Sequence, residues 1–172
     1  MRDLIESIRG EYERYKALGE GAVAQVRDAE LSQPGPNGGN SLAVICWHLS
    51  GNLKSRFTDF LTSDGEKPWR DREAEFDDRA VSRAEFLATW EEGWRVLLAA
   101  LDGLTDANLN DTITIRGHAH TVHEALHRSV AHAAYHVGQM VYVAKGLRGD
   151  AWQSLSIPRG QSQSYVPRGP RG

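Results

Sequence analysis

The chain has 172 residues, of which 40% are hydrophobic and 25% charged, and its formal net charge is -3. These values are typical of one globular domain, and the lack of a positive surplus argues against a nucleic-acid partner. One cysteine excludes an intrachain disulfide framework, and a charged N-terminal segment without any stretch of roughly 20 apolar residues argues against a signal peptide or a membrane span, so we expect a soluble, cytoplasmic protein.

Apolar residues at helical spacing predict two helices in the first third of the chain. Residues 3–29 carry one apolar stripe, which Gly19 and Gly21 interrupt and are expected to bend. A Pro-, Gly- and Asn-rich loop follows. Asn40 or Ser41 is then expected to cap a second helix over residues 42–61.

A long polar connection separates the second helix from the third. Pro68 and the many charges favour a solvent-exposed loop, including the charged run of residues 70–78. A connection of this length is typical of a crossover or a functional lid. Ser82 and Glu85 have the spacing of a capping box, which predicts a third helix that ends near residue 104.

The last part of the chain completes an all-α prediction. The sequence TITI at residues 112–115 is compatible with a short extended segment, and residues 121–145 form the fourth predicted helix, with Gly146 as its cap. Four amphipathic helices with long crossover connections predict a four-helix bundle over residues 1–150. Residues 151–172 are expected to be a flexible tail or an arm packed on the domain or on a partner subunit.

The histidines are the residues that indicate a metal-binding function. His132 and His136 are four residues apart, so both side chains lie on one face of the fourth helix, at the border of its apolar stripe. His123 and His127 form a second such pair, rotated away from the first and expected at the rim. Imidazole is the commonest transition-metal ligand, and two on one turn form a clamp.

A third histidine extends this clamp to a metal-site prediction. His48 in the second predicted helix also lies one residue off its apolar stripe, so two facing helices would bring it against His132 and His136. Three protein ligands with one open position are typical of a catalytic zinc site. Spacing alone leaves a second interpretation open, in which these histidines only satisfy one another inside the core.

Two sequence segments resemble a known family. HLSGN, which begins at His48, and HAAYHVGQM, which begins at His132, are similar to the DinB/YfiT-like superfamily of bacterial four-helix bundles. In that superfamily a histidine of the second helix joins a His-x-x-x-His pair that precedes x-Gly-Gln. The segment NLKSRFTDFLTSDGEKPWRDREAEF resembles one branch of it, and the likeness covers most of the chain. Many members have arginine where Val137 stands here.

The resemblance implies a divalent metal ion, zinc or nickel, bound by His48, His132 and His136 with open coordination. It also implies a homodimer. Known relatives include transferases and isomerases that use low-molecular-weight thiols and act on bacillithiol or mycothiol adducts, so the resemblance adds such a thiol as a possible cofactor.

Four further residues are considered for a role in ligand binding or catalysis. Asn52 and Gln139 are candidates to hydrogen-bond a ligand or a substrate, and no catalytic side chain is assigned. Cys46 is rejected as a nucleophile, because it lies about 200° around the helix from His48. Trp69, beside Pro68, is a candidate for the mouth of a pocket.

Three functional hypotheses follow from these observations. The first is a metal-dependent enzyme that acts on a small molecule, either as a hydrolase or as a thiol transferase. The second is a non-catalytic metal-binding bundle in stress response or metal sequestration, which a fourth protein ligand would favour. The third is a structural or dimerising module whose histidines only satisfy one another.

Overall fold

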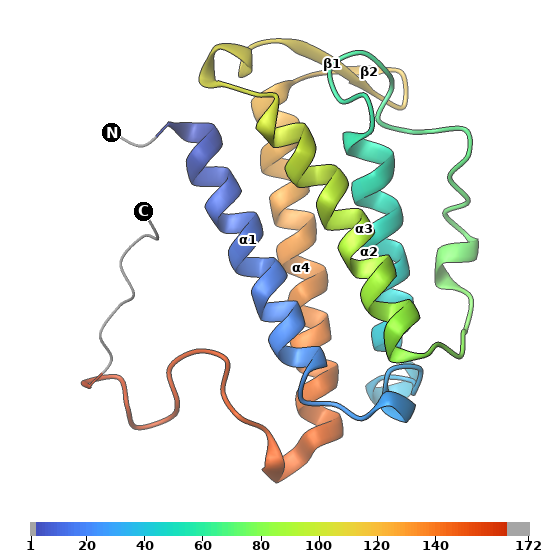
Figure 1. The fold of residues 1–172 in the computed structure, drawn as a ribbon, viewed down its shortest axis with the longest axis vertical. Helices are drawn as coiled ribbons and strands as arrows, with labels where there is room; N and C mark the ends of the chain where they lie inside the picture. The colour runs from blue at the N-terminus through green and yellow to red at the C-terminus, as the bar shows by residue number, and fades with distance from the viewer. Residues whose placement is uncertain (1–2, 165–172) are drawn as a thin grey trace.

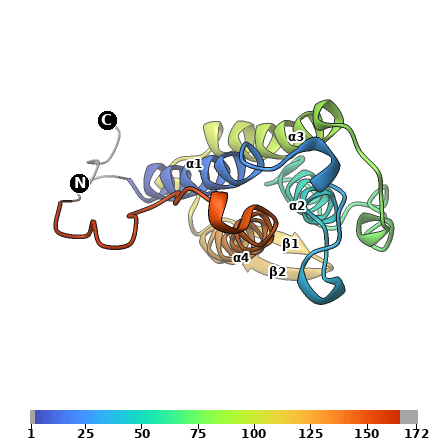
Figure 2. The same cartoon turned by 90° about the horizontal axis from the view of Figure 1, so that it is seen from below.

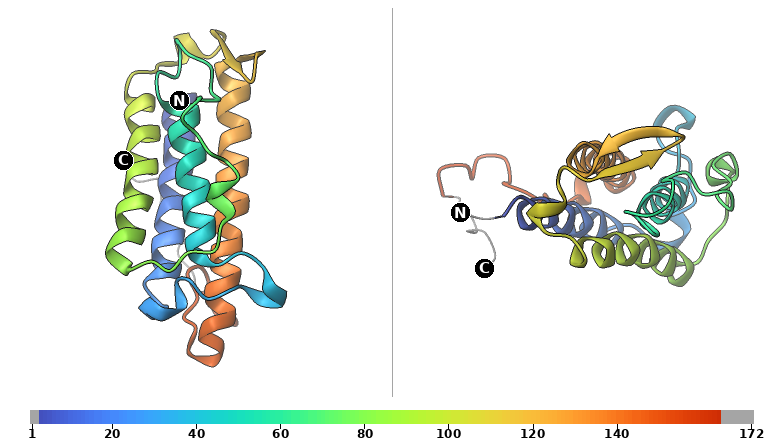
Figure 3. Two further views of the ribbon diagram at one scale, coloured as in Figure 1. Left: turned by 90° about the vertical axis from the view of Figure 1, so that its right-hand side faces the viewer. Right: turned by 90° about the horizontal axis from the view of Figure 1, so that it is seen from above.

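The computed structural model describes residues 3–164, which form four long helices and one small β-hairpin (Figure 1). The elements are α1 (Leu4–Val23), α2 (Leu42–Phe57), α3 (Arg83–Asp102), β1 (Thr112–Ile115), β2 (His118–Thr121) and α4 (Val122–Arg148). The helices lie side by side, with α1 packed mainly on α4 and α2 mainly on α3 (Figures 2 and 3). The prediction of a predominantly helical, four-helix fold is confirmed, and the TITI segment is strand β1.

The connection between α2 and α3 is a crossover that runs along the bundle. In Figure 1, α2 and α3 point in the same direction, so residues 58–82 return from the end of α2 to the start of α3. On the way they pass α2 and form the short 3-10 helix Ala74–Phe76, which packs against it. The crossover therefore brings polar side chains against the middle of α2.

Several helix ends differ from the predicted ones. Helix α1 continues through Gly19 and Gly21 and ends at Val23. Gly19 lets the Trp90 ring of α3 pack close to α1, since a Cβ atom there would stand 2.6 Å from that ring. Helix α2 ends at Phe57, just before Asp59 takes a positive φ of 49°. Helix α4 passes Gly146 and ends at Arg148, so Gly149, with φ 52°, follows it instead.

One apolar core joins all four helices. Its largest buried side chains come from α1 and α3, where Tyr12 contacts Trp94 edge-on and Trp94 lies beside Trp90. The Tyr12 hydroxyl donates to the Leu126 carbonyl of α4 at 3.3 Å, so the buried phenol is satisfied. Ser41 caps α2 as predicted, since its side chain accepts from the Val44 amide.

The β-hairpin is fastened to the loop after α2. Its turn places Arg116 and Gly117 at positive φ. The Asp64 carboxylate accepts from both of their amides at 2.8 Å and from the Glu66 amide at 2.7 Å. These backbone hydrogen bonds lower the pKa of Asp64 to about 2. The loop and the hairpin turn therefore share one end of the bundle as a connected unit.

The first part of the predicted tail is packed on the domain. Gln25 and Gln153 exchange two hydrogen bonds, and the partly buried Trp152 and Leu155 contact the core. Residues 165–172, the rest of that tail, lie outside the described residues. No helix in the described part of the chain combines the length and the apolar character needed to cross a membrane.

Candidate metal centre

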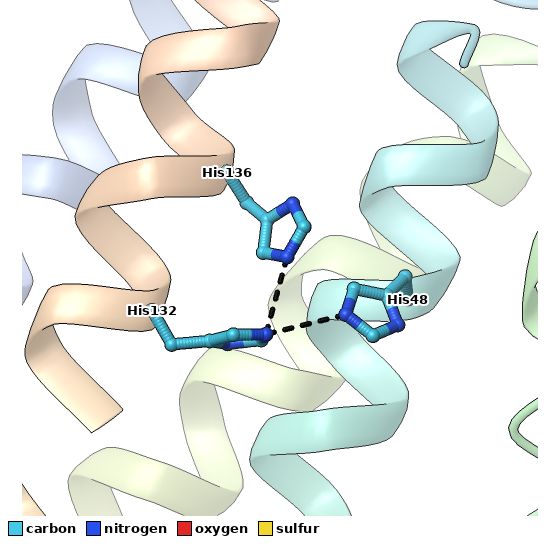
Figure 4. Close-up of side chains that lie close together, drawn as sticks. All are labelled: His48, His132 and His136. Carbon is cyan, nitrogen blue, oxygen red and sulfur yellow. Dashed lines mark hydrogen bonds between the residues drawn. The ribbon is translucent and has the colours of Figure 1, made fainter. Parts of the chain in front are cut away.

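Three imidazoles from two helices converge at the middle of the bundle (Figure 4). His48 comes from α2, and His132 and His136 come from successive turns of α4. The Nε2 atom of His132 lies 3.2 Å from Nε2 of His48 and 3.1 Å from Nε2 of His136. His48 and His136 are buried, and His132 is partly exposed. The sequence-predicted trio is thus brought together.

The two distances from His132 Nε2 and the charge state of the rings fit a divalent metal ion. Ligand nitrogens about 2.1 Å from one ion lie about 3.0 Å apart in octahedral geometry and about 3.4 Å apart in tetrahedral geometry. Burial lowers the pKa of His132 to about 3 and that of His136 to about 4, and repulsion from neighbouring imidazoles adds to both shifts. Both rings are therefore neutral near pH 7, as metal ligands must be.

Glu75 of the crossover fixes the ring of His48 from behind. Its Oε2 atom lies 2.9 Å from His48 Nδ1, and both groups are buried. A carboxylate only accepts, so in the neutral imidazole Nδ1 donates and Nε2 keeps a free lone pair. Burial raises the pKa of Glu75, but hydrogen bonds from His48 and Arg70 outweigh it, and the net pKa lies below the usual value. Glu75 is therefore an anion at neutral pH.

Arg70 holds Glu75 in turn. Its guanidinium donates to both carboxylate oxygens at 2.7 and 2.8 Å, and only 2% of its side chain is exposed. The prediction that residues 70–78 form a solvated loop is wrong for these two side chains. Nothing in the spacing of this charged run singles out Glu75, although a carboxylate behind a metal-binding histidine is a common arrangement.

Gln139 takes the corresponding place behind His136. Its Oε1 atom lies 2.9 Å from His136 Nδ1, an arrangement in which Nδ1 donates and Nε2 again keeps its lone pair. Two lone pairs therefore point at His132 Nε2, which carries at most one proton to donate. A cation among the three Nε2 atoms satisfies all of them, whereas a set of histidines alone leaves one unpaired.

Of the other residues that the sequence singled out, only Asn52 lies in a cavity next to the three histidines. Asn52 lines a cavity that adjoins the site, and Trp69 is 56% exposed and does not line it. His127 of the second histidine pair is exposed. Cys46 is fully buried with Sγ toward the Phe86 carbonyl, and burial raises the pKa of its thiol, which agrees with its rejection as a nucleophile.

Comparison with known proteins places the chain in a family. Neither a curated protein nor a solved structure matches it. A family model described as "Protein of unknown function (DUF1572)" matches residues 1–161. This match carries no link to the DinB/YfiT-like superfamily, so that resemblance stays a prediction. Because the match covers nearly the whole sequence, the chain belongs to the DUF1572 family.

Proposed function

We propose that this protein is a divalent-metal-dependent enzyme that acts on a small molecule, with His48, His132 and His136 as the metal ligands. One observation carries the proposal: three Nε2 atoms face one another while the other ring nitrogens of His48 and His136 are engaged by Glu75 and Gln139. This arrangement orients lone pairs toward one point before any ion binds.

A catalytic metal site matches these three ligands better than a metal-storage site or a structural metal site does. Among the described residues the cluster contains three potential ligands, and Glu75 lies on the Nδ1 side of His48, away from the other two rings. A closed structural zinc site normally has four protein ligands, whereas a catalytic site keeps a position open. The adjoining cavity, which His48 and His132 help to line, gives a small molecule access to that position.

Such an ion, when bound, supplies Lewis acidity that activates water or a thiol as a nucleophile. The chain's own side chains hold the geometry. Glu75 and Arg70 orient His48, Gln139 orients His136, and the Phe76 ring packs on His48 with centroids 4.6 Å apart. Asn52 lines the cavity and is placed to hydrogen-bond a substrate.

The resemblance to the DinB/YfiT-like superfamily supports the proposed metal, co-substrate and assembly. It favours zinc or nickel as the metal, a low-molecular-weight thiol as co-substrate and a homodimer as the assembly. Tyr135 and Tyr142, 64% and 67% exposed and two turns apart on α4, provide an apolar face for that dimer. Sedimentation velocity of the wild type and of Tyr135→Ala measures the assembly, and a monomeric wild type would remove this part.

Metal analysis of purified protein tests the ligand assignment. We expect about one zinc or nickel ion per wild-type chain and a loss of metal in His132→Ala. His127→Ala is the matched control, since His127 is exposed on the same helix and should leave the metal content unchanged. Equal metal content in wild type and His132→Ala would show that the proposed site is wrong. Turnover screens with thiol adducts and simple esters then separate transferase from hydrolase, and no turnover of either favours the non-catalytic alternative.

A further inference from the structure

A positively lined cavity adjoins the three histidines. Its volume is about 170 Å³, and His48 and His132 form part of its wall. Five arginines also line it, and none of its lining residues in the described part of the chain is acidic. These arginines come from α2, the crossover, the hairpin turn and α4; they are Arg56, Arg70, Arg72, Arg116 and Arg128.

The five arginines that line this cavity, called the arginine pocket below, form ion pairs with fewer carboxylates than their own number. Glu66 is shared by Arg56 and Arg116, Glu75 pairs with Arg70, and Glu73 pairs with Arg72. Arg128 lines the cavity and is exposed, and it forms no hydrogen bond or ion pair through its side chain with any residue between 3 and 164. The ion pairs of these five guanidinium groups therefore involve three carboxylates, so two guanidinium groups have no carboxylate of their own among residues 3–164.

The guanidinium groups are crowded enough to repel one another. Arg56 is the clearest case: only 15% of its side chain is exposed. Burial lowers the pKa of its guanidinium, and the charges of Arg70 and Arg116 add to that effect in spite of Glu66. An anion in the cavity would relieve this repulsion, because guanidinium groups bind carboxylates and phosphates with paired hydrogen bonds.

The pocket also has a defined position relative to the histidines. Arg128 lies four residues before His132 on α4, so the two side chains share a face about 6 Å apart along the helix axis. Phe57, Phe60 and Ile115 supply apolar wall between the charged groups. A small molecule that binds here can contact the arginines together with His48 and His132, because all of them line the same cavity.

We propose that the arginine pocket binds the anionic end of the substrate, and that the substrate is a small dianion, either a phosphate monoester or a dicarboxylate, whose reacting group faces the three histidines. The inference rests on the proposed function for the direction of the reacting group. The anion site itself stands on the arginines alone. Arg128, whose guanidinium has no partner among residues 3–164, is the residue that recognises the dianion most directly.

Calorimetric titration with sodium phosphate and, separately, with sodium succinate tests this assignment at fixed ionic strength. Both zinc-loaded and chelator-treated protein are titrated. We expect saturable binding of at least one dianion, weakened about 10–100-fold in Arg128→Gln. Arg95→Gln is the matched control, because Arg95 is exposed on α3 and does not line the cavity. The tighter of the two probes identifies the phosphate or the dicarboxylate class.

The outcomes separate the two proposals. Failure of both dianions to bind, or equal binding by wild type and Arg128→Gln, overturns the anion site even if the protein holds zinc. Dianion binding that depends on Arg128 in a protein unable to hold zinc keeps the anion site and removes the metal-dependent function.

Discussion

Gly51→Ala should weaken metal binding without removing any polar group. Gly51 lies on α2, and a Cβ atom there would stand 2.1 Å from Glu75 Oε1 and 2.8 Å from its carboxyl carbon. The Glu75 side chain cannot change its rotamer freely, because Arg70 donates a hydrogen bond to each of its carboxylate oxygens. The carboxylate must move by about 1 Å to reach ordinary contact distance, which breaks its 2.9 Å hydrogen bond to His48.

The expected size follows from that lost hydrogen bond. Removing the partner behind a metal-binding histidine costs about 10–100-fold in affinity, equal to about 1.4–2.7 kcal/mol. Alanine also favours helix over glycine by about 1 kcal/mol, which offsets part of the strain in the folded state. Gly138→Ala on α4 is the matched control, since nothing lies within 4 Å of its added Cβ atom.

Competition titration of zinc against a chromogenic chelator measures both variants. We expect wild-type zinc affinity for Gly138→Ala and a weaker affinity for Gly51→Ala, with thermal unfolding to verify that each variant is folded. Equal zinc affinity in wild type and Gly51→Ala would refute the role of Glu75 in orienting His48.

Two further predictions concern stability. The pKa values of His132 and His136 in the folded state, about 3 and about 4, lie below the unfolded value, so the unfolded chain binds more protons below pH of about 6.5. The free energy of unfolding of metal-free protein should therefore fall between pH 7 and pH 5 in urea titrations, and a flat profile would contradict the burial of these rings. Asp106 accepts from the Leu4 and Ile5 amides at 2.8 and 3.0 Å, so Asp106→Ala should cost about 1 kcal/mol in thermal unfolding. Asp3→Ala, at an N-cap without a side-chain hydrogen bond, should cost close to nothing, and equal losses would disprove the assignment.

Local patterns predicted the helices and the histidine trio well. Both depend on the helical repeat, and His132 and His136 lie one turn apart whatever surrounds them. The role of Gly19 could not be predicted, because it lies against the Trp90 ring of another helix, where an added Cβ atom would stand 2.6 Å from that ring. Periodicity within one segment contains no information about such a contact.

The burial and the contacts of residues in the polar connections could not be predicted from the sequence for a related reason. Glu75 and Arg70 belong to a charged run without periodicity, and their burial follows from the path of the crossover along α2. The arginine pocket likewise gathers side chains from four separate segments. The Asp106 cap of α1 is contributed from 102 residues away in the chain, which no capping pattern can reveal.

The separation of His48 and His132 by 84 residues has a kinetic consequence. An unfolded or partly folded chain offers at most the two-histidine half of the ligand set, on α4, until α2 docks beside it. Metal therefore binds the native state far better than any earlier state. We expect added zinc to lengthen the lifetime of the folded protein by slowing its unfolding, while the rate of refolding changes little.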